Sequence, residues 1–413
     1  MRVASRDISR AAGAGVFALL LMSTAQRVTP TVASGILREH LRLTSSEFGV
    51  LAGASALAFG LAQFPGGYLS DVHGPVRVIK LAAIASAFGT LVFLTAATYP
   101  IALAGRVVFG VADSIVFVGL MRFAVGSTSG GGAYHIGKVQ ATVGASFASA
   151  AVLALGLNAT SFPILFGGLA VVQVALALAI KSPPRGGGRA TALPAMAEVM
   201  EVARTRQFWA ALLANTGLFA PFFAWTSGWA VPYLVAVVGM STDQARLVVV
   251  AGSLASVAGA LALGRLSDVL RRRRHLMLVG SAVMTGAWAL LIVLGTPGAV
   301  PTVALAMVVG FTFPACNSSL VLAKESFRAD RAGMVMGLSN MASSLLAALL
   351  GAAAGLALDA GWQGALDHGL RVYPRHAYIA VPAVFMVGSA LAVLGALLAK
   401  ETHGRQVPAP IAA

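Results

Sequence analysis

Long apolar stretches, separated by short polar or Gly/Pro-rich breaks, occupy most of the chain. A transmembrane helix needs about 20 apolar residues to cross about 30 Å of hydrocarbon, and stretches of this length recur along the sequence. Cutting the sequence at the breaks predicts twelve membrane-spanning helices. The six in the first half cover residues 11–37, 47–70, 77–98, 101–123, 134–158 and 162–181. The six in the second half cover residues 207–237, 243–266, 275–296, 300–323, 332–358 and 377–399.

A polar segment separates the two sets of six spans. It begins with two prolines and three consecutive glycines, which resist helix formation and predict a flexible linker. Its later part, from Met196 to Arg206, could form a short amphipathic helix on the membrane surface. We therefore expect four parts: an N-terminal six-helix bundle over 1–181, a cytoplasmic linker over 182–206, a C-terminal six-helix bundle over 207–400 and a cytoplasmic tail over 401–413.

The composition excludes several classes of protein. Hydrophobic residues make up 58% of the chain and charged residues 10%, against roughly 25% charged in a soluble domain. The net charge of +15 is spread singly between apolar stretches, so we expect a lipid bilayer and no nucleic acid as partner. Cys316 is the only cysteine, which excludes an intramolecular disulfide. Because the sequence has no metal-ligand, nucleotide-binding or nucleophile motif, we expect no metal, no cofactor and no enzymatic activity.

The basic residues indicate which side of the membrane each loop occupies. With the N-terminus inside, about 22 of the 29 Lys and Arg residues lie on the cytoplasmic side. The outer side then keeps Arg38, Arg42, Arg371 and Arg375. Since cytoplasmic loops are enriched in Lys and Arg, we expect both termini in the cytoplasm.

One short motif occurs at the same place in each half. The second span ends in Gly67-Tyr-Leu-Ser-Asp71, and the eighth ends in Gly264-Arg-Leu-Ser-Asp268. Glycine permits close helix contact, and the aspartate can pair with a loop arginine or cap the next helix. The repeat in register indicates two halves of similar construction.

With this repeat, its twelve spans and its central linker, the chain resembles the major facilitator superfamily, whose signature after the second helix is close to Gly-x-Leu-Ala-Asp-Arg-x-Gly-Arg-Lys. The resemblance implies an all-α membrane protein of bacterial type, with 12 transmembrane helices in two pseudo-symmetric six-helix bundles and a site near the midplane. Val72, Pro75 and Val76 depart from the signature. The resemblance assigns gating roles to Gly67, Asp71, Gly74, Arg77, Gly264 and Asp268.

Two further comparisons with the superfamily concern coupling and direction. Arg106-Val-Val-Phe-Gly110 in the fourth span resembles the Arg-x-x-x-Gly motif, which is linked in some members to proton coupling. The fifth span lacks the Gly-Pro pair that is usual in drug–proton antiporters, and reads Val143-Gly-Ala-Ser-Phe-Ala-Ser-Ala150 instead. We therefore favour proton-coupled uptake over export.

Three charged residues lie deep in the predicted spans, where a charge costs roughly 2.5 to 3.5 kcal/mol and usually faces a cavity or a partner. Arg106 and Asp113 share a helix face, but about 10 Å of rise separates them, too far for a direct pair. Arg27 lies in the same depth range, so we expect it to join Arg106 and Asp113 in one charged group. We expect Arg27 and Arg106 to bind an anionic group, with Asp113 as proton carrier or ion-pair gate. The alternative is a charge network that only fixes helix packing.

Uncharged candidates complete the predicted site. Each amide could also serve only as a contact between helices, and a tryptophan near a span end could be an interfacial anchor. The candidate substrate-binding residues besides Arg27 are Gln26, Asn215, Trp225, Asn317 and Asn340.

Together these features predict a secondary active transporter that works by alternating access. We expect proton-coupled uptake of an organic anion or zwitterion by a monomer in the bacterial cytoplasmic membrane. An efflux pump for a drug, siderophore or metabolite is the alternative within transport. A transporter-like receptor or assembly partner without flux is the alternative of another class.

Overall fold

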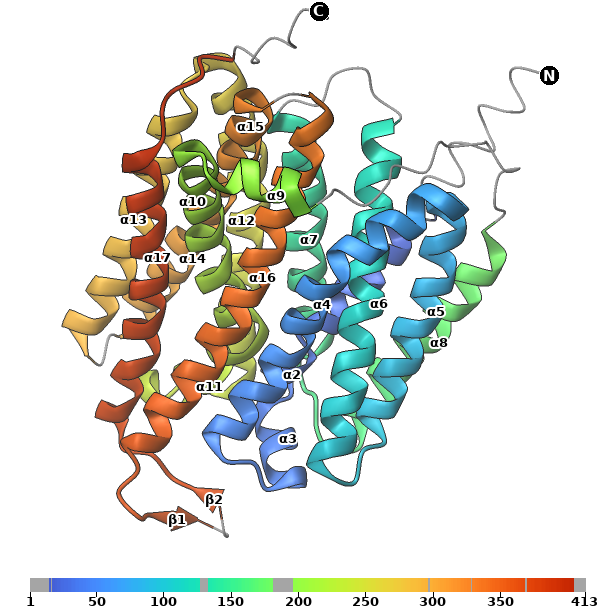
Figure 1. Ribbon diagram of the computed structural model, residues 1–413. Helices are drawn as coiled ribbons and strands as arrows, with labels where there is room; N and C mark the ends of the chain where they lie inside the picture. The colour runs from blue at the N-terminus through green and yellow to red at the C-terminus, as the bar shows by residue number, and fades with distance from the viewer. Residues whose placement is uncertain are drawn as a thin grey trace, which may run out of the picture.

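The computed structural model describes residues 15, 17–126, 133–180, 196–295, 298–327, 329–367 and 370–404. Within these ranges the molecule is built almost entirely of long helices that run between two ends (Figure 1). One end carries α3 (Ser34–Leu41) and a two-residue antiparallel pair, β1 (Leu366–Asp367) with β2 (Leu370–Arg371). The other carries the short helix α9 (Met196–Ala203). We call these the hairpin end and the linker end.

The first half begins with helical residues 17–27 and ends before the linker. Its helices after residue 27 are α2 (Thr29–Val32), α3, α4 (Ser45–His73), α5 (Pro75–Leu94), α6 (Tyr99–Gly126), α7 (Ala133–Leu153) and α8 (Ser161–Ala179). In this half α6 packs against both α4 and α5, and α8 covers α5.

The second half repeats the pattern with more interruptions. Its first span is α10 (Arg206–Ala224), continued by the π-helical turn η1 (Trp225–Trp229), α11 (Ala230–Tyr233) and a second π-helical turn, η2 (Leu234–Val238). The remaining elements are α12 (Thr242–Leu270), α13 (Arg273–Leu294), α14 (Ala299–Thr312), the 3₁₀ turn η3 (Phe313–Ala315), α15 (Cys316–Ser326), α16 (Ala329–Ala360), the 3₁₀ turn η4 (Arg375–Ile379) and α17 (Ala380–Leu398).

The spans confirm the predicted fold class. Among the described residues, ten helices are long and apolar enough to cross a membrane. The other two predicted spans correspond to the helical residues from 17 onward and to α7. Two boundaries were wrong. The first span is not one helix over 11–37, because it breaks at Val28 and Ala33, and the fifth ends at Leu153 rather than near residue 158.

The helices α4 and α12 show how closely the halves correspond. Both have 29 residues, and both begin with a capping box, formed by Thr44 with Glu47 and by Ser241 with Gln244. In a capping box the two side chains satisfy backbone N–H groups that the helix leaves unpaired. The two helices that carry the repeated motif are therefore built alike from their first turn.

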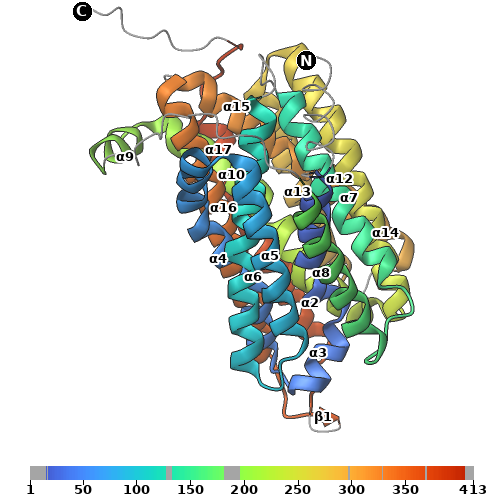
Figure 2. The ribbon, with the colours of Figure 1, turned by 90° about the vertical axis from the view of Figure 1, so that its right-hand side faces the viewer.

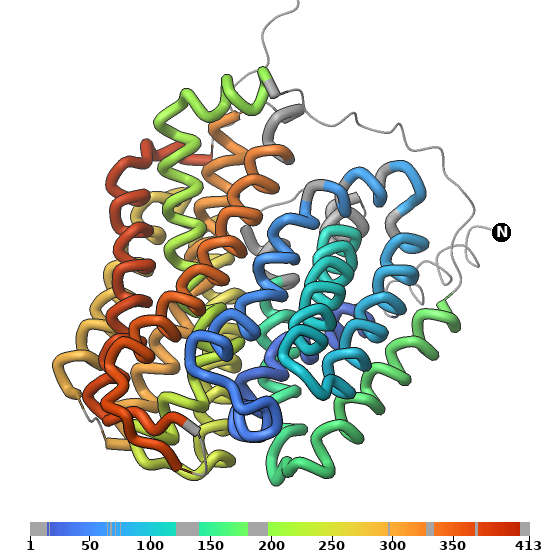
Figure 3. The backbone as a smooth tube through the Cα atoms, turned by 60° about the horizontal axis from the view of Figure 1, so that its bottom comes forward, coloured from blue at the N-terminus to red at the C-terminus, as the bar shows by residue number. Residues whose placement is uncertain are grey.

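The halves meet along two helix pairs, α4 with α16 and α7 with α12 (Figures 2 and 3). Small residues allow the backbones to approach closely, as in other membrane helix pairs. A Cβ at Gly49 would lie 2.6 Å from the carbonyl oxygen of Gly351, and one at Gly53 would lie 3.0 Å from that of Ala348. These contacts fall in the part of α4 and α16 nearest the hairpin end, so the halves are packed tightly there.

Candidate functional site

A break in the first helix creates the centre of the site. Pro30 has no N–H, so the carbonyl of Gln26 loses its helical partner. The carbonyl of Arg27 also lacks one, because the next turn is tightened around Val28. Arg106 of α6 satisfies both groups, with its Nη1 3.4 Å from the Gln26 oxygen and its Nη2 3.1 Å from the Arg27 oxygen. Pro30 thus opens the helix at the two carbonyls that Arg106 binds.

The break leaves Arg27 directed at Asp113 of α6. The Nε of Arg27 donates to one carboxylate oxygen of Asp113 at 2.7 Å, and its Nη2 makes a second ion-pair contact with the same oxygen. The hydroxyl of Ser23, one turn earlier, donates to the other carboxylate oxygen at 2.7 Å. All three side chains are buried. An ion pair without water interacts strongly, but each ion has given up its hydration, so the pair depends on its partners.

Arg106 has different partners from those of Arg27. Besides the two carbonyls, its Nη2 bonds the hydroxyl of Ser55 at 2.6 Å. Its guanidinium lies 4.9 Å from the ring centre of Phe109 and 5.5 Å from that of Phe93. Its Nε is buried without a hydrogen-bond partner among the described residues. Arg106 is thus a buried cation held by neutral groups and π faces.

Aromatic rings from both halves enclose Arg27. Its guanidinium lies 4.5 Å from the ring centre of Phe59 in α4 and 5.3 Å from that of Phe223 in α10. Phe223 is stacked on Phe219 at 5.2 Å and meets Phe147 of α7 edge-on at 6.0 Å. Neither Phe59 nor Phe223 was among the predicted site residues. Their signal in the sequence is weak, because phenylalanines are common in these spans.

The side chain of Gln26 is engaged inside the first half. Its Nε2 donates to Gln173 of α8 at 2.8 Å, and its Oε1 accepts a hydrogen bond from Thr90 of α5. Gln173 in turn donates to the carbonyl of Ala83 at 2.7 Å. This network links three helices, and a substrate contact for Gln26 stays a prediction.

The amide candidates of the second half lie at the contact of α10, α15 and α16. Asn215 donates to the Ser343 hydroxyl at 2.7 Å and to the Ser339 carbonyl at 3.3 Å. Asn317 is buried, and its amide nitrogen has no hydrogen-bond partner among the described residues. Asn340 is only partly buried. The unpaired Asn317 amide is therefore the strongest substrate-contact candidate of this group.

Trp225 faces away from the first half. Its ring packs edge-on against Tyr233 and Trp288, each at 5.5 Å, and against Phe385 at 6.4 Å. All of these rings belong to the second half. On this helix it is Phe223, two residues earlier, that reaches Arg27.

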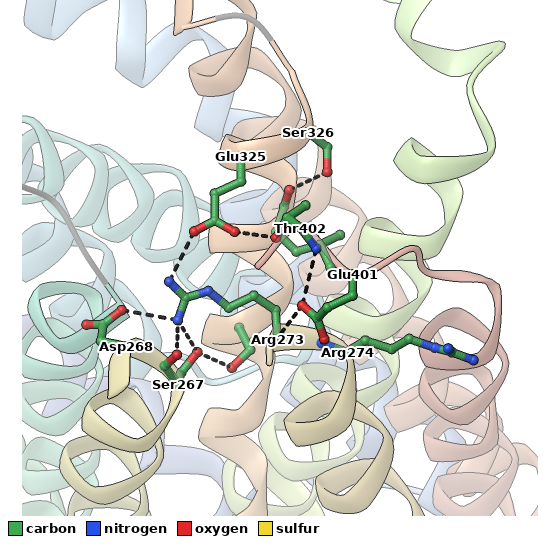
Figure 4. A network of polar contacts seen from close by, with 10 residues as sticks. Ser267, Asp268, Arg273, Arg274, Glu325, Ser326, Glu401 and Thr402 are labelled. Atoms are coloured by element: carbon green, nitrogen blue, oxygen red, sulfur yellow. Dashed lines mark hydrogen bonds and ion pairs between the residues drawn. The ribbon is translucent and has the colours of Figure 1, made fainter. Parts of the chain in front are cut away.

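The second copy of the repeated motif forms a polar network at the linker end (Figure 4). Arg273, at the start of α13, bonds the Ser267 hydroxyl at 2.8 Å and pairs with Asp268 at 3.2 Å and with Glu325 of α15 at 3.0 Å. Glu401 accepts the backbone N–H of Arg273 at 2.8 Å, so it caps α13. The network joins α12, α13, α15 and the segment after α17.

The rest of the predicted gating set is partly visible. Gly264 is buried, and Gly74 has φ 84° between α4 and α5, a conformation that favours glycine. Arg77 is exposed in the first turn of α5. The side chain of Asp71 and the surroundings of Gly67 lie outside the part of the chain that the structure describes.

At the hairpin end, an acidic residue of the second half caps a helix of the first. Asp359, near the end of α16, accepts the backbone N–H of Ser46 at 2.7 Å and that of Ser45 at 3.3 Å. The Tyr373 hydroxyl donates to the same carboxylate. Burial, followed by the Asp359 hydrogen bond, raises the pKa of Tyr373, so its hydroxyl keeps its proton. Asp359 also lies 3.5 Å from Arg371.

A second contact between the halves lies across this end. Arg246 of α12 is buried and donates from Nε and Nη2 to the Val32 carbonyl at 2.9 and 2.6 Å. Its Nη1 pairs with Asp243 at 2.7 Å, and Asp243 accepts the Gly156 N–H at 3.0 Å. A cavity of about 300 Å³ adjoins this contact. Arg246 was not among the predicted deep charges, because it lies near the start of its span.

The chain is similar to several known transporters. The model of the Major Facilitator Superfamily matches residues 14–352. A protein of Cupriavidus necator described as a probable sulfoacetate transporter, SauU, is 28% identical over 118 residues, which is 28% of this chain and 24% of that protein. The chain thus spans about a quarter of the length of this relative.

Solved structures support the same fold. An inward-facing, unoccupied bacterial homologue of the human lysosomal transporter Spinster has a TM-score of 0.74 at 14% identity, covering 97% of this chain and 99% of that one. A D-xylose–proton symporter has a TM-score of 0.72 at 15% identity, covering 96% and 99%. The nucleoside transporter NupG has a TM-score of 0.72 at 11% identity, covering 94% and 98%. The chain therefore belongs to the Major Facilitator Superfamily, and it is a multi-pass membrane protein and secondary transporter of a small molecule rather than an enzyme.

Proposed function

We propose that the protein takes up an organic anion, with protons as the coupling ion. The observation that carries this proposal is the buried pair between Arg27 and Asp113, beside a second buried cation, Arg106. An arginine fork matches the geometry of carboxylate and sulfonate oxygens. A cationic centre enclosed by phenyl rings therefore suits an anion with a compact headgroup.

The exchange of partners at Arg27 gives a route to coupling. An arriving anion competes with Asp113 for the Arg27 guanidinium. The Asp113 carboxylate then shares the two guanidiniums with the anion, and an excess of negative charge in this buried site favours its protonation. Ser23 can hydrogen-bond either form of the acid, because a hydroxyl both donates and accepts. Substrate and proton thus bind to neighbouring groups of one ion pair.

The relative supports the substrate class. SauU is described as a probable sulfoacetate transporter, and sulfoacetate carries a sulfonate and a carboxylate. Since the matched segment is short, we take from it the class of organic anion and use sulfoacetate as a first probe.

We also propose a setting for this mechanism. The basic residues support placing the linker end in the cytoplasm of a bacterial inner membrane, with both termini inside. In that orientation, tight packing at the hairpin end corresponds to closure on the outer side. We propose that residues 1–181 and 207–400 move as two bodies within a monomer, joined by 182–206, and that Gly264 and Asp268 gate the linker end.

The proposal is tested by uptake into proteoliposomes. We expect an inward proton gradient to drive accumulation of sulfoacetate or of another small organic anion in a panel. Arg27→Gln should abolish this uptake, whereas Arg27→Lys should retain more of it, since the charge persists without the fork. Arg375→Gln, which alters an exposed arginine at the hairpin end, is the matched control.

Two results would contradict the proposal. One is uptake that is equal in wild type and Arg27→Gln. The other is proton-driven export of cationic or neutral compounds with no movement of any anion, which would favour the efflux pump.

A further inference from the structure

The centre of the first half holds one more positive charge than negative. Arg27 and Asp113 form a neutral pair, while Arg106 contacts two carbonyls, a hydroxyl and two rings, and no carboxylate. All three charged residues are at least 97% buried. The sum of their charges is +1, from two guanidiniums and one carboxylate.

The side chains that surround Arg27, Arg106 and Asp113 are neutral, so they leave the net charge of the cluster at +1. Helix 17–27 contributes Ser23 and α4 contributes Ser55 and Phe59. Rings face it from α5, from α6 itself and from the second half, namely Phe93, Phe109 and Phe223. None of these side chains is charged or titrates near neutral pH. Within the described residues, Asp113 is therefore the one group in this cluster that can adjust the balance by taking a proton.

An uncompensated charge is expensive in a buried site, because its hydration is lost and no partner replaces it. A bound monoanion brings the total from +1 to zero. A bound dianion brings it to −1, and a proton on Asp113 then restores zero. The unpaired Nε of Arg106 leaves a hydrogen-bond donor beside the ion pair for the added negative group.

We propose that the charge of the substrate sets the number of protons that cross with it: a monoanion binds without a proton, and a dianion binds with one proton on Asp113. This rests on the proposed function, since it assumes an organic anion at Arg27. The charges balance in both cases, because the loaded site is neutral and the empty site returns with a net charge of +1. Each transport cycle therefore moves a net charge of −1 inward with the substrate.

The test compares two substrates of similar size. Sulfoacetate is a dianion at neutral pH, and its amide, sulfoacetamide, is a monoanion. Wild-type protein in proteoliposomes with an internal pH dye is given each in turn, and uptake is measured by mass spectrometry. We expect about one proton taken up per sulfoacetate and none per sulfoacetamide. Both should be driven by an inside-positive membrane potential to the same degree.

The variant Asp113→Asn should transport the two substrates to different extents. The variant fixes the site at +2, so we expect sulfoacetate uptake to persist without proton movement. Sulfoacetamide uptake should fall roughly tenfold or more, since one positive charge stays unbalanced. Glu39→Gln, at an exposed acid of the hairpin end, should leave both stoichiometries unchanged.

The outcomes distinguish the two proposals. Equal proton counts for the two substrates in the wild type, or proton uptake with sulfoacetate in Asp113→Asn, would overturn the charge rule while leaving anion transport in place. Uptake of neither compound, nor of any other small mono- or dianion, would contradict the proposed function and the charge rule together. The wild-type comparison decides the matter even if the variant does not fold.

Discussion

At the scale of single residues, Arg27 and Arg106 have different partners, although the sequence predicted that both bind one anionic group. Arg27 makes the one buried ion pair seen within the described centre, whereas Arg106 holds the backbone that presents it. Arginine suits the second task because its fork of five donors can serve several acceptors at once. The same residue type thus forms a buried ion pair at one position and binds backbone carbonyls at the other.

The contacts of Arg106 with these carbonyls predict the effect of Arg106→Gln. The shorter side chain should leave the carbonyl of Arg27 without a donor and that of Gln26 with the Thr29 hydroxyl alone. A buried group left unsatisfied costs about 1–3 kcal/mol. We expect a lower midpoint of thermal unfolding in detergent, together with reduced uptake. Unchanged thermal stability of this variant would show that water or another group takes over the Arg27 carbonyl.

The choice between Phe223 and Trp225 shows what sequence reasoning could not reach at this scale. The two residues differ by about 200° around a helix, so only one of them can face the first half. The sequence does not show how a helix is rotated in its bundle, so it did not identify Phe223 as the neighbour of Arg27. A substrate contact for Trp225 stays a prediction. In contrast, the partnership of Arg27 with Asp113 followed from depth alone, because both lie where an unpaired charge is costly.

At the scale of elements, the broken first span matters most. Pro30 ends helix 17–27 at Arg27, and the chain then continues toward the hairpin end through the separate short helices α2 and α3. Without this break, the carbonyls that Arg106 contacts would bond within their own helix. The apolar pattern predicted the span but not the break, because an internal proline can kink a membrane helix or be tolerated in it.

Pro30→Ala tests the role of the break. The new N–H can pair with the Gln26 carbonyl in a continuous helix, in competition with Arg106. We expect uptake to fall several-fold, while the thermal unfolding midpoint stays equal or rises. Pro100→Ala, at the start of α6 where a proline fits without cost, is the matched control and should leave uptake unchanged. Normal uptake by Pro30→Ala would mean that the break does not position Arg27.

At the scale of the whole molecule, the all-α membrane fold and its long apolar spans were predictable from the sequence, because length and polarity determine them. The first part of the predicted linker, over 182–195, lies outside the residues that the structure describes and stays a prediction. The contacts between the halves were not predictable. Asp359 and Arg246 act through backbone groups of helices more than 200 residues away in the sequence. Backbone acceptors and donors leave no trace in the sequence, so such partners become visible only in the folded molecule.

Asp359 gives a prediction at this scale. A carboxylate at a helix N-terminus contributes about 0.3–1 kcal/mol, and up to about 2 when partly buried. Asp359→Asn should therefore weaken closure of the hairpin end by roughly 2- to 30-fold. The measurement is thiol labelling of Ala52→Cys, a buried position of α4 at a small cavity that η1 and α16 also line, in a Cys316→Ser background. Labelling that does not increase would show that Arg246 and the helix contacts hold this end closed without Asp359.

The hydrogen bonds that Asp359 and Arg246 support at the hairpin end are chemically one-sided. In them the first half offers backbone groups, the N–H of Ser45, Ser46 and Gly156 and the carbonyl of Val32, and the second half supplies the side chains. Arg38 is the first-half side chain that differs, because its guanidinium lies 5.6 Å from the ring centre of Tyr373. Most substitutions of the residues that offer backbone groups keep those groups, so they cannot weaken the closure by deleting a partner. A genetic selection for transporters that leak or stay open should therefore recover its polar-contact mutations mainly between α12 and Tyr373, with Arg38 as the site in the first half, and second-site revertants should appear at the same positions. Mutational robustness would differ between two halves of the same architecture.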